Sequence, residues 1–359
     1  MLTHIRNAAL GAFAVLALAA HAPAQSCAGD LNSDNRVDGA DLGTLLFTWG
    51  ACTGCAEDLT ADGQVDGADL GALLSNWGVC PVIIVPSWAT LVEAQPDPAV
   101  VTDASLRAAI TATGLAWRVR DTATQVEMLL VPPGTFQMGC IMASNLWRCW
   151  PWEQPVHQVT LTNAFYLGRY EVTQSQWTAQ MGSNPSEFQS ASAEVPASQV
   201  PNRPVERVSW TTVQGYLGAT GFRLPTEAEW EYACRAGTQE PYYNGSTDDN
   251  TVESLAWYLL NSGDSPQDPP QTRPVGGKLA NAHGFHDMLG NAWEWVNDWY
   301  GGYTSDAQTN PTGPASASDR VIRGGSFGNN SYNVRSSIRF DATPGLAERS
   351  FGFRVAKNP

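Results

Sequence analysis

The sequence predicts an α+β protein, in which a small all-α module precedes a large, irregular, loop-rich domain. Two acidic loops recur 28 residues apart, at 30–42 and 58–70, and helix-spaced leucines follow each loop. Beyond residue 125 the chain is rich in Gly, Pro, Asn and Trp, which favours long ordered loops over a large regular sheet. Capping residues at Thr173, Ser209 and Thr226 predict three short helices among those loops.

Residues 1–24 have the features of a secretory signal peptide. His4 and Arg6 precede an apolar run over 8–20, and Ala22-Pro23-Ala24 supplies the small-x-small cleavage pattern. The run is too short to cross a bilayer comfortably, and no later segment resembles a membrane span. We therefore expect an exported protein without a membrane span, located in the periplasm or outside the cell.

The net charge of −15 is concentrated near the N-terminus. Nine of the 35 acidic residues lie between Cys27 and Cys80, together with a single arginine. A chain this acidic repels nucleic acid, and its clustered carboxylates instead favour a cation.

The two acidic loops carry oxygen ligands at the spacing of an EF-hand calcium loop. Position 7, which is Arg36 in the first loop and Gln64 in the second, offers only its backbone carbonyl. Position 6 requires a positive φ, which Asn35 in the first loop and Gly63 in the second can adopt. Apolar Val37 and Val65 at position 8 indicate loops that pair back to back. The alternative is a merely solvated acidic surface. The candidate ligands at positions 1, 3, 5, 7, 9 and 12 are Asp30, Asn32, Asp34, Arg36, Asp38 and Asp41, then Asp58, Thr60, Asp62, Gln64, Asp66 and Asp69.

An apolar stripe after each loop predicts a helix that packs against its repeat. The stripes end before Gly50 and Gly78, where we expect the helices to stop. Residues 25–80 thus resemble a dockerin, the duplicated calcium module that binds cohesin domains. Gly39-Ala40 and Gly67-Ala68 replace the Ser-Thr pairs with which many dockerins contact cohesin, so the resemblance implies calcium more firmly than it implies a cohesin-like or cell-surface partner. The stripes are Leu42, Leu45, Leu46, Trp49 and Leu70, Leu73, Leu74, Trp77.

Seven cysteines fit an oxidising compartment. Spacing predicts the pairs Cys27–Cys52, Cys55–Cys80 and Cys140–Cys149, although sequence alone does not fix connectivity. Cys52 and Cys55 could instead be half of a zinc site, but the outer cysteines stand alone. The unpaired Cys234 is expected to be a buried, inert thiol rather than a reactive one.

Residues 81–124 read as a linker or an N-terminal extension of the next domain. A short helix is expected over 104–113 and a strand over 115–120.

Residues 125–357 resemble the formylglycine-generating (sulfatase-modifying factor) family. The resemblance rests on Val131-Pro132-Pro133-Gly134-Thr135-Phe136, Arg223-Leu224-Pro225-Thr226-Glu227, Gly290-Asn291-Ala292-Trp293-Glu294-Trp295, Arg323-Gly324-Gly325-Ser326 and Gly352-Phe353-Arg354-Val355. It implies a fold related to C-type lectin domains. It also implies a structural calcium bound by the side chains of Asp287 and Glu294 and the carbonyls of Gly290 and Ala292. The alternative is that Glu294 binds no calcium and only accepts hydrogen bonds from loop amides.

The same resemblance places the family's copper-binding cysteine pair at Asn329 and Val334. Soft thiolates select copper(I), and an amide and an isopropyl group do not replace them. Ser326 and Trp293, which line the family's cleft, are retained. We therefore expect calcium but not copper, and a binding or scaffold role with a peptide or glycan ligand. The alternative is an oxidoreductase of the formylglycine-generating type with altered metal ligands.

Two other groups could carry chemistry. His283 and His286 could hold a metal, although the resemblance places them in a structural loop. Glu227, Glu229 and Glu231 are expected at a helix start, where their charge favours the helix dipole.

Overall fold

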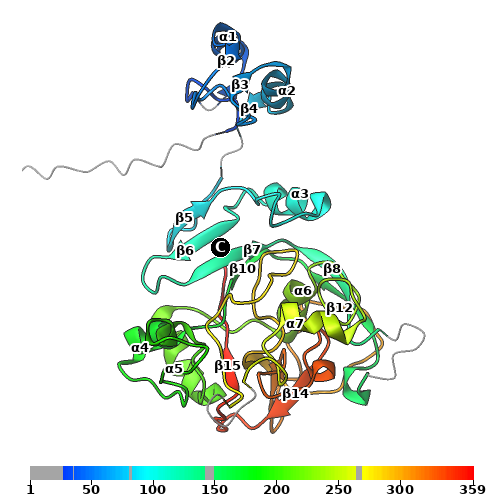
Figure 1. Ribbon diagram of the computed structural model, residues 1–359. Coiled ribbons are helices and arrows are strands. Elements are labelled where there is room, and N and C mark those ends of the chain that lie inside the picture. The colour runs from blue at the N-terminus through cyan, green and yellow to red at the C-terminus, as the bar shows by residue number, and fades with distance from the viewer. Residues whose placement is uncertain (1–26, 35, 81–82, 142–148, 264–268) are drawn as a thin grey trace, which may run out of the picture. The chain divides into compact units, whose positions relative to one another are not determined.

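The structure is a computed structural model that describes residues 27–34, 36–80, 83–141, 149–263 and 269–359 (Figure 1). The chain divides into two compact units, Met1–Val82 and Ile83–Pro359, which are described separately. The expected signal peptide and Asn35 lie outside the described residues. No helix in the described ranges is long and apolar enough to cross a membrane.

The small module contains two helices, α1 (Gly39–Phe47) and α2 (Gly67–Ser75). Asp38 and Asp66 cap them, and Asp41 and Asp69 close the capping boxes. Both helices end earlier than expected, because Gly50 and Gly78 have positive φ and belong to two-residue strands instead. These strands are β1 (Arg36–Val37), β2 (Gly50–Ala51), β3 (Gln64–Val65) and β4 (Gly78–Val79).

The expectation that the loops pair with each other is wrong. β1 pairs antiparallel with β4, and β2 pairs antiparallel with β3, so each loop pairs with the segment after a helix. The predicted disulfides of this module are wrong for the same reason. The β1–β4 pair brings the module's ends together, and the disulfides are Cys27–Cys80 and Cys52–Cys55. A disulfide at Cys52–Cys55 also argues against the zinc alternative.

Only half of each apolar stripe is buried. Leu45 and Leu73 are fully buried with Val37 and Val65, and the two helices contact each other. The outer half stays about 50% exposed in both repeats, at Leu46, Trp49, Leu74 and Trp77. The module therefore presents the same apolar pair twice on its surface.

The large unit contains three sheets joined by long loops. The five-stranded sheet has the order β16 (Ala356–Lys357), β10 (Phe165–Gly168), β7 (Glu127–Val131), β6 (Arg118–Asp121), β5 (Ala89–Glu93). The four-stranded sheet has the order β14 (Arg339–Ala342), β13 (Arg320–Arg323), β11 (Trp293–Trp299), β15 (Phe351–Phe353). The three-stranded sheet has the order β12 (Gln308–Thr309), β9 (His157–Leu161), β8 (Gly134–Met138).

Residues 83–124 are built into this unit. β5 and β6 extend the sheet that contains β7, and α3 (Ala104–Ala112) forms where the apolar spacing predicts it. The expected strand over 115–120 starts later, at Arg118, and β5 carries no clear signal in the sequence. This segment is therefore part of the large unit's core rather than a free connection.

The capped helices of the large unit form as predicted. These are α4 (Gln174–Met181), α5 (Trp210–Thr220) and α6 (Glu227–Arg235), capped by Thr173, Ser209 and Thr226. Gly182 and Gly221 end the first two with left-handed conformations. Figure 1 shows α4 and α5 side by side, whereas α6 contacts β8, β11 and β13. The short helices are α7 (Val252–Leu255), η1 (Pro151–Glu153), η2 (Ala197–Asn202), η3 (Asp249–Thr251) and η4 (Ser331–Asn333).

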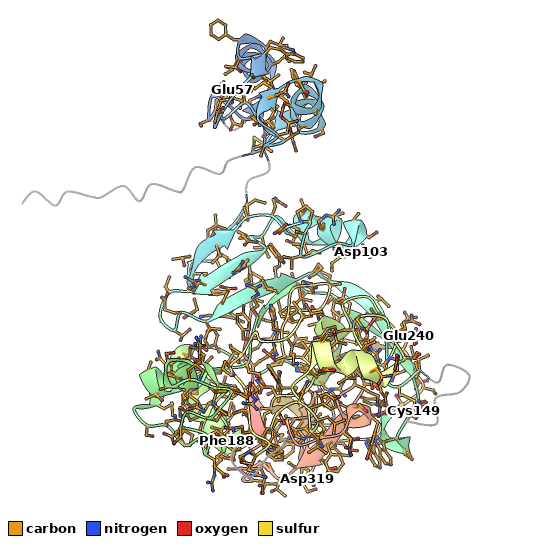
Figure 2. All side chains as sticks on the ribbon, in the orientation of Figure 1. Glu57, Asp103, Cys149, Phe188, Glu240 and Asp319 are labelled. Carbon is orange, nitrogen blue, oxygen red and sulfur yellow. A yellow bond between two sulfur atoms is a disulfide. The ribbon has the colours of Figure 1, made fainter. Side chains whose placement is uncertain are left out.

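Figure 2 shows the side chains that fill the large unit. Arginine–glutamate pairs among them fasten the loops to this frame. Arg339 bonds Glu227, Arg223 bonds Glu229, and Arg323 and Arg235 both bond Glu231. The three glutamates do lie in the first turns of α6, as expected, but their main role is to hold β13, β14 and the 223–226 turn.

Candidate functional site

The Gly-Gly-Ser segment turns sharply after β13. Gly324 and Gly325 both have positive φ, and a Cβ on Gly324 would lie 3.0 Å from the carbonyl oxygen of Met288. A Cβ on Gly325 would lie 2.7 Å from Val334 Cγ1. Only glycine fits both positions, and the turn brings Ser326 back towards the 329–334 segment.

Asn329 and Val334 are both committed to holding this turn. Asn329 Oδ1 accepts hydrogen bonds from Ser326 N (2.9 Å) and Ser326 Oγ (2.8 Å). Val334 is fully buried and packs in the main hydrophobic core. The structure thus brings the predicted cleft residues Ser326, Asn329 and Val334 together, but neither Asn329 nor Val334 offers a soft metal ligand.

A row of aromatic rings, which sequence reasoning missed, lies next to this turn. Trp150 stacks on Trp152 with ring centroids 5.0 Å apart, and Phe340 contacts both Trp152 and Trp293 at 6.2 Å. Trp150 Nε1 donates to Asn333 Oδ1 at 3.3 Å, which ties the row to the 329–334 segment. Trp293 is 8% exposed, whereas Trp150 and Phe340 are 38% and 48% exposed. The sequence signal was the Trp150-Pro151-Trp152 spacing.

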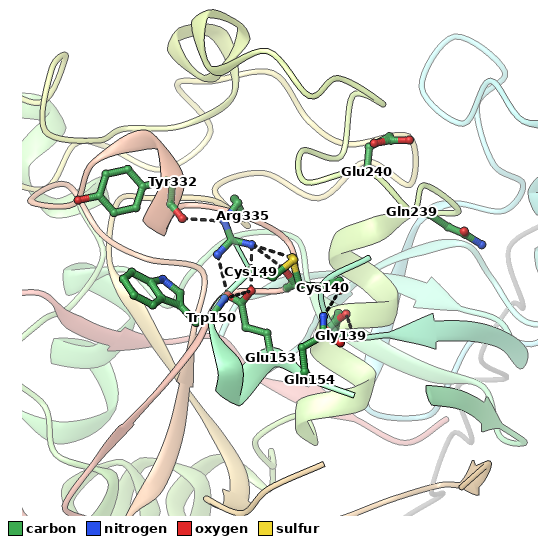
Figure 3. Close-up of a disulfide and its surroundings, with 12 residues drawn as sticks. Gly139, Cys140, Cys149, Trp150, Glu153, Gln154, Gln239, Glu240, Tyr332 and Arg335 are labelled. Carbon is green, nitrogen blue, oxygen red and sulfur yellow. Dashed lines mark hydrogen bonds and ion pairs between the residues drawn. A yellow bond between two sulfur atoms is a disulfide. The ribbon is translucent and has the colours of Figure 1, made fainter. Parts of the chain in front are cut away.

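The predicted disulfide Cys140–Cys149 is confirmed, and it lies against a buried ion pair (Figure 3). Arg335 Nη1 is 3.3 Å from Cys140 Sγ and 3.0 Å from Glu153 Oε2, while Nη2 is 2.7 Å from Glu153 Oε1. Arg335 Nε also donates to Tyr332 O at 2.7 Å. Burial raises the pKa of Glu153 despite the arginine. Disulfide and ion pair together fasten residues 140–154 to residues 332–335.

The side chains predicted to bind a structural calcium, Asp287 and Glu294, are buried near a third carboxylate, but among the described residues the oxygens of the three do not all lie within metal-binding distance of one another. Glu294 accepts from Arg354 Nη2 (2.7 Å) and from Trp230 Nε1 (2.7 Å), so its oxygens are already occupied. Asp287 Oδ2 accepts from Gly276 N at 2.7 Å, whereas Oδ1 is buried and has no hydrogen-bond partner among the described residues. Burial raises the pKa of Asp287 to about 6. An orphaned carboxylate oxygen of this kind fits a hard cation.

Glu171 is this third carboxylate, and the sequence did not single it out. Its oxygens accept from Asn291 Nδ2 (2.6 Å) and Ala292 N (2.9 Å), which orients the 290–292 loop. Burial raises the pKa of Glu171 well above its ordinary value, and the nearby Asp287 and Glu294 raise it further. The structure therefore places Asp287, Gly290, Ala292 and Glu294 close to a third carboxylate and to Arg354.

The two acidic loops of the small module fold alike. Asp41 Oδ1 accepts from the amides of Leu31 and Asn32, and Asp69 Oδ1 accepts from Thr60 N. Asp30 and Asp58 bond loop amides in the same way. Gly63 has the expected positive φ of 89°. Side-chain oxygens therefore turn into both loops, as the calcium hypothesis requires.

The other candidate groups are structural. His283 Nε2 bonds Leu130 O at 2.8 Å and His286 Nδ1 bonds Lys278 O at 2.9 Å, so each histidine uses a ring nitrogen on the backbone. Burial lowers the pKa of His283 to about 4. Cys234 is free and buried, as expected, and burial raises the pKa of its thiol to about 12, which disfavours the reactive thiolate.

Comparison with known proteins gives one family and several relatives. Residues 101–359 match the family described as sulfatase-modifying factor enzyme 1-like domain. The formylglycine-generating enzyme of Bos taurus is 37% identical over 167 residues, which cover 44% of this chain and 44% of the bovine protein. The chaperone protein LppX of Paenibacillus barcinonensis is 32% identical over 232 residues, 50% of this chain and 74% of that protein. The match thus spans less than half the length of the bovine enzyme.

Two solved structures share the fold. Treponema denticola variable protein 1 is 29% identical with a TM-score of 0.57, over 65% of this chain and 95% of that one. PvdO from Pseudomonas aeruginosa is 28% identical with a TM-score of 0.54, over 67% of this chain and 98% of that one.

Proposed function

This chain belongs to the sulfatase-modifying factor enzyme 1-like domain family, and we propose that its large unit binds a ligand rather than oxidising a cysteine with copper. The protein is exported, and the small module anchors it to a partner. The observation that carries the proposal is the commitment of Asn329 and Val334 to the turn at Ser326.

Copper(I) needs two thiolates at the positions that Asn329 and Val334 occupy. Asn329 offers a neutral oxygen that already accepts two hydrogen bonds, and Val334 offers only methyl groups inside the core. Cys234, the free cysteine of the described residues, is buried in α6, and Cys140 and Cys149 are joined. Trp150 and Phe340 are the exposed members of the aromatic row, and they form a surface suited to a peptide or glycan above the buried Trp293.

Calcium stabilises both units in this proposal. The two loops of the small module supply carboxylates at matching positions, and Asp287 Oδ1 is the buried orphan oxygen in the large unit. Arg354 holds Glu294, so Glu294 acts at the calcium site through one shared oxygen or only orients the loop.

The small module also supports an anchoring role. Leu46 and Trp49 in one repeat and Leu74 and Trp77 in the other remain about half exposed. Large apolar side chains exposed at equivalent positions indicate a surface that a protein partner covers. A cohesin-like or other cell-surface domain is the class of partner that a dockerin-like module takes.

The alternative is an oxidoreductase of the formylglycine-generating type. The 37% identity to the bovine enzyme favours it, together with the retained Ser326 and Trp293. Such an enzyme would need metal ligands other than a cysteine pair at 329 and 334.

Copper(I) binding by residues 25–359 distinguishes the two functions. We expect no tight copper(I) uptake and no conversion of a Cys-x-Pro-x-Arg peptide to formylglycine, measured by competition with a chromophoric chelator and by mass spectrometry. The matched control is the Asn329→Cys, Val334→Cys double variant, which should gain copper(I) affinity. Tight uptake with peptide turnover by the unmodified chain would overturn the binding proposal.

A further inference from the structure

A polar cavity lies in the large unit, away from the Ser326 turn. It has a volume of about 340 Å³, and its walls come from β8, β9, the start of α6, the end of β11, the glycine-rich loop 301–314 and β14. None of Ser326, Asn329, Val334 or the buried carboxylates near Asp287 lines it. Its volume falls within the range of about 300–1,000 Å³ that is typical of small-ligand sites.

The charged residues of the wall neutralise each other. Arg339 Nε and Nη2 bond Glu227 Oε1 and Oε2 at 2.7 and 2.8 Å. Tyr303 OH donates to Glu227 Oε1 at 3.0 Å, and Arg339 Nη1 donates to Gly301 O at 2.8 Å. These bonds hold the 301–303 segment in place and leave no uncompensated charge from the pair.

Asp298 supplies an unused polar atom in this wall. It is 3% exposed, and its Oδ2 accepts from Glu227 N at 2.9 Å. Its Oδ1 has no hydrogen-bond partner among the described residues and lies towards Gly313, which also lines the cavity. Burial and the neighbouring Glu227 raise the pKa of Asp298 to about 8. The raised pKa favours the neutral carboxyl, whose hydrogen is on Oδ1 because Oδ2 accepts the amide hydrogen of Glu227.

His157 supplies the complementary acceptor. Its Nδ1 is 3.1 Å from Pro155 O, which can only accept, so Nδ1 holds the hydrogen. In the neutral ring Nε2 is then an acceptor, and it has no partner within the described part of the chain. The ring is fixed against Tyr303, with centroids 4.8 Å apart.

A metal does not explain this arrangement. Among the described residues, the one cluster of three His, Cys, Asp or Glu ligand atoms is Cys140, Cys149 and Glu153, so His157, Glu227 and Asp298 do not converge on a point. An anion would face the Glu227 carboxylate, and a cation would face the Arg339 guanidinium. A neutral ligand with hydroxyl groups avoids both costs, since each hydroxyl both donates and accepts.

We infer that this cavity binds a neutral, hydroxyl-rich ring of the monosaccharide class, with Asp298 donating to one hydroxyl and His157 accepting from another. The inference goes beyond the ligand surface proposed above, because the cavity is a separate site that shares no residue with the aromatic row, and it does not depend on the copper result. The glycines of the 301–313 loop leave the backbone open to the ligand. A Cβ on Gly313 would lie 2.9 Å from Trp299 O, so this wall cannot carry a side chain there.

Gly302 allows the cavity to be blocked without straining the backbone. It lines the cavity, it is absent from the positive-φ glycines, and a Cβ there meets no atom within 4 Å. Gly302→Leu should therefore fold and obstruct the ligand. Gly345→Leu is the matched control, because Gly345 is equally open and does not line the cavity.

The test measures dissociation constants of residues 25–359 for glucose, galactose, mannose and N-acetylglucosamine by saturation-transfer NMR and calorimetry. We expect at least one neutral sugar to bind in the millimolar range or tighter, Gly302→Leu to weaken it at least tenfold, and Gly345→Leu to leave it unchanged. Glucuronate and glucose 6-phosphate should bind at least tenfold more weakly. No neutral sugar binding at 20 mM, or binding unaffected by Gly302→Leu, or equal affinity for the charged sugars, would each overturn the inference.

The pH dependence separates this site from any other sugar site. Asp298 faces Glu227 and Glu229 on α6, Arg339 on β14, Arg320 on β13, His157 on β9 and Tyr303 on the loop. Raising the pH from 7 to 9 removes the Asp298 proton, and affinity should fall about tenfold. Asp298→Asn keeps a donor at all pH values, so its affinity should match the unmodified protein at pH 7 and stay flat to pH 9. An unmodified protein with no pH dependence would contradict the role of Asp298.

Discussion

Asn329 accepts both hydrogen bonds that Ser326 can donate, from its backbone N–H at 2.9 Å and from its hydroxyl at 2.8 Å. The carboxamide thus acts as a cap for the turn that follows β13. A residue at this position is structural in this chain, whatever its counterpart does in relatives. Its loss should cost stability rather than activity.

Asn329→Ala should lower the free energy of unfolding by about 1 kcal/mol, because a part-buried amide and hydroxyl lose their acceptor. Asn329→Asp should keep most of that stability, since a carboxylate oxygen accepts the same bonds. Urea unfolding of residues 25–359 measures both. The matched control is Asn330→Ala, whose exposed side chain bonds only Tyr332 OH and should change stability by less than about 0.5 kcal/mol. Equal losses for the two alanine variants would show that the cap contributes nothing.

Arg335 and Glu153 form a buried pair, so breaking it should be costly. Arg335→Met leaves the Glu153 carboxylate buried without its partner and should destabilise the protein by about 3–5 kcal/mol. The double variant Glu153→Gln, Arg335→Met should recover part of that loss. The comparison pair is Arg349–Glu187, which is 3.7 Å apart and about half exposed, and Arg349→Met should cost under about 1 kcal/mol. Additive losses at 153 and 335 in a double-mutant cycle would rule out the coupling.

Local signals predicted the helices of the large unit correctly. Thr173, Ser209 and Thr226 each cap a helix within their own next turn, so a few adjacent residues contain the whole signal. The Cys140–Cys149 disulfide was also predictable, because only eight residues lie between the two cysteines and no other cysteine is near them in the sequence.

Pairings between distant segments were not predictable in the same way. Cys27 pairs with Cys80 because β1 and β4 align Arg36 with Val79. The sequence around either cysteine contains no signal that predicts this strand register. Arg354 and Glu171 contact the 291–294 segment, which contains predicted calcium residues, from positions at least 60 residues away on either side. The cavity at Asp298 likewise needs six segments to assemble, and the sequence shows its residues only as isolated polar positions.

Glu206 should make the protein less stable as the pH rises through neutrality. The side chain is fully buried, Oε1 accepts from Phe188 N at 2.9 Å, and Oε2 has no partner in the described ranges. Burial raises its pKa to about 7, so the folded state binds a proton that the unfolded chain releases near pH 4.5. Stability from this group is therefore fully present below about pH 4.5 and is lost as the pH rises to about 7, by roughly 3 kcal/mol in total.

Glu206→Gln tests this sign. The variant removes the charge but keeps the shape, so it should be more stable than the unmodified protein at pH 8 and nearly equal at pH 5. Thermal unfolding at both pH values measures the difference. Glu194→Gln is a suitable control, since Glu194 is exposed and its substitution should change stability by less than about 0.5 kcal/mol. A Gln variant that is less stable at pH 8 would refute the assignment.

Calcium removal should destabilise both units, and mutations should separate the loss of stability in the small module from that in the large unit. At a calcium concentration of 100 times the dissociation constant, each site adds about 2.7 kcal/mol to the stability of its unit. Calorimetry with and without a chelator should therefore show a lower melting temperature without calcium. Asp30→Ala, Asp58→Ala should abolish the shift of the small module and preserve that of the large unit, because Asp287 is untouched. Glu57→Ala, adjacent to the second loop but outside its ligand positions, removes a charge and should leave the calcium effect unchanged. A melting profile that the chelator does not alter would contradict calcium binding in both units.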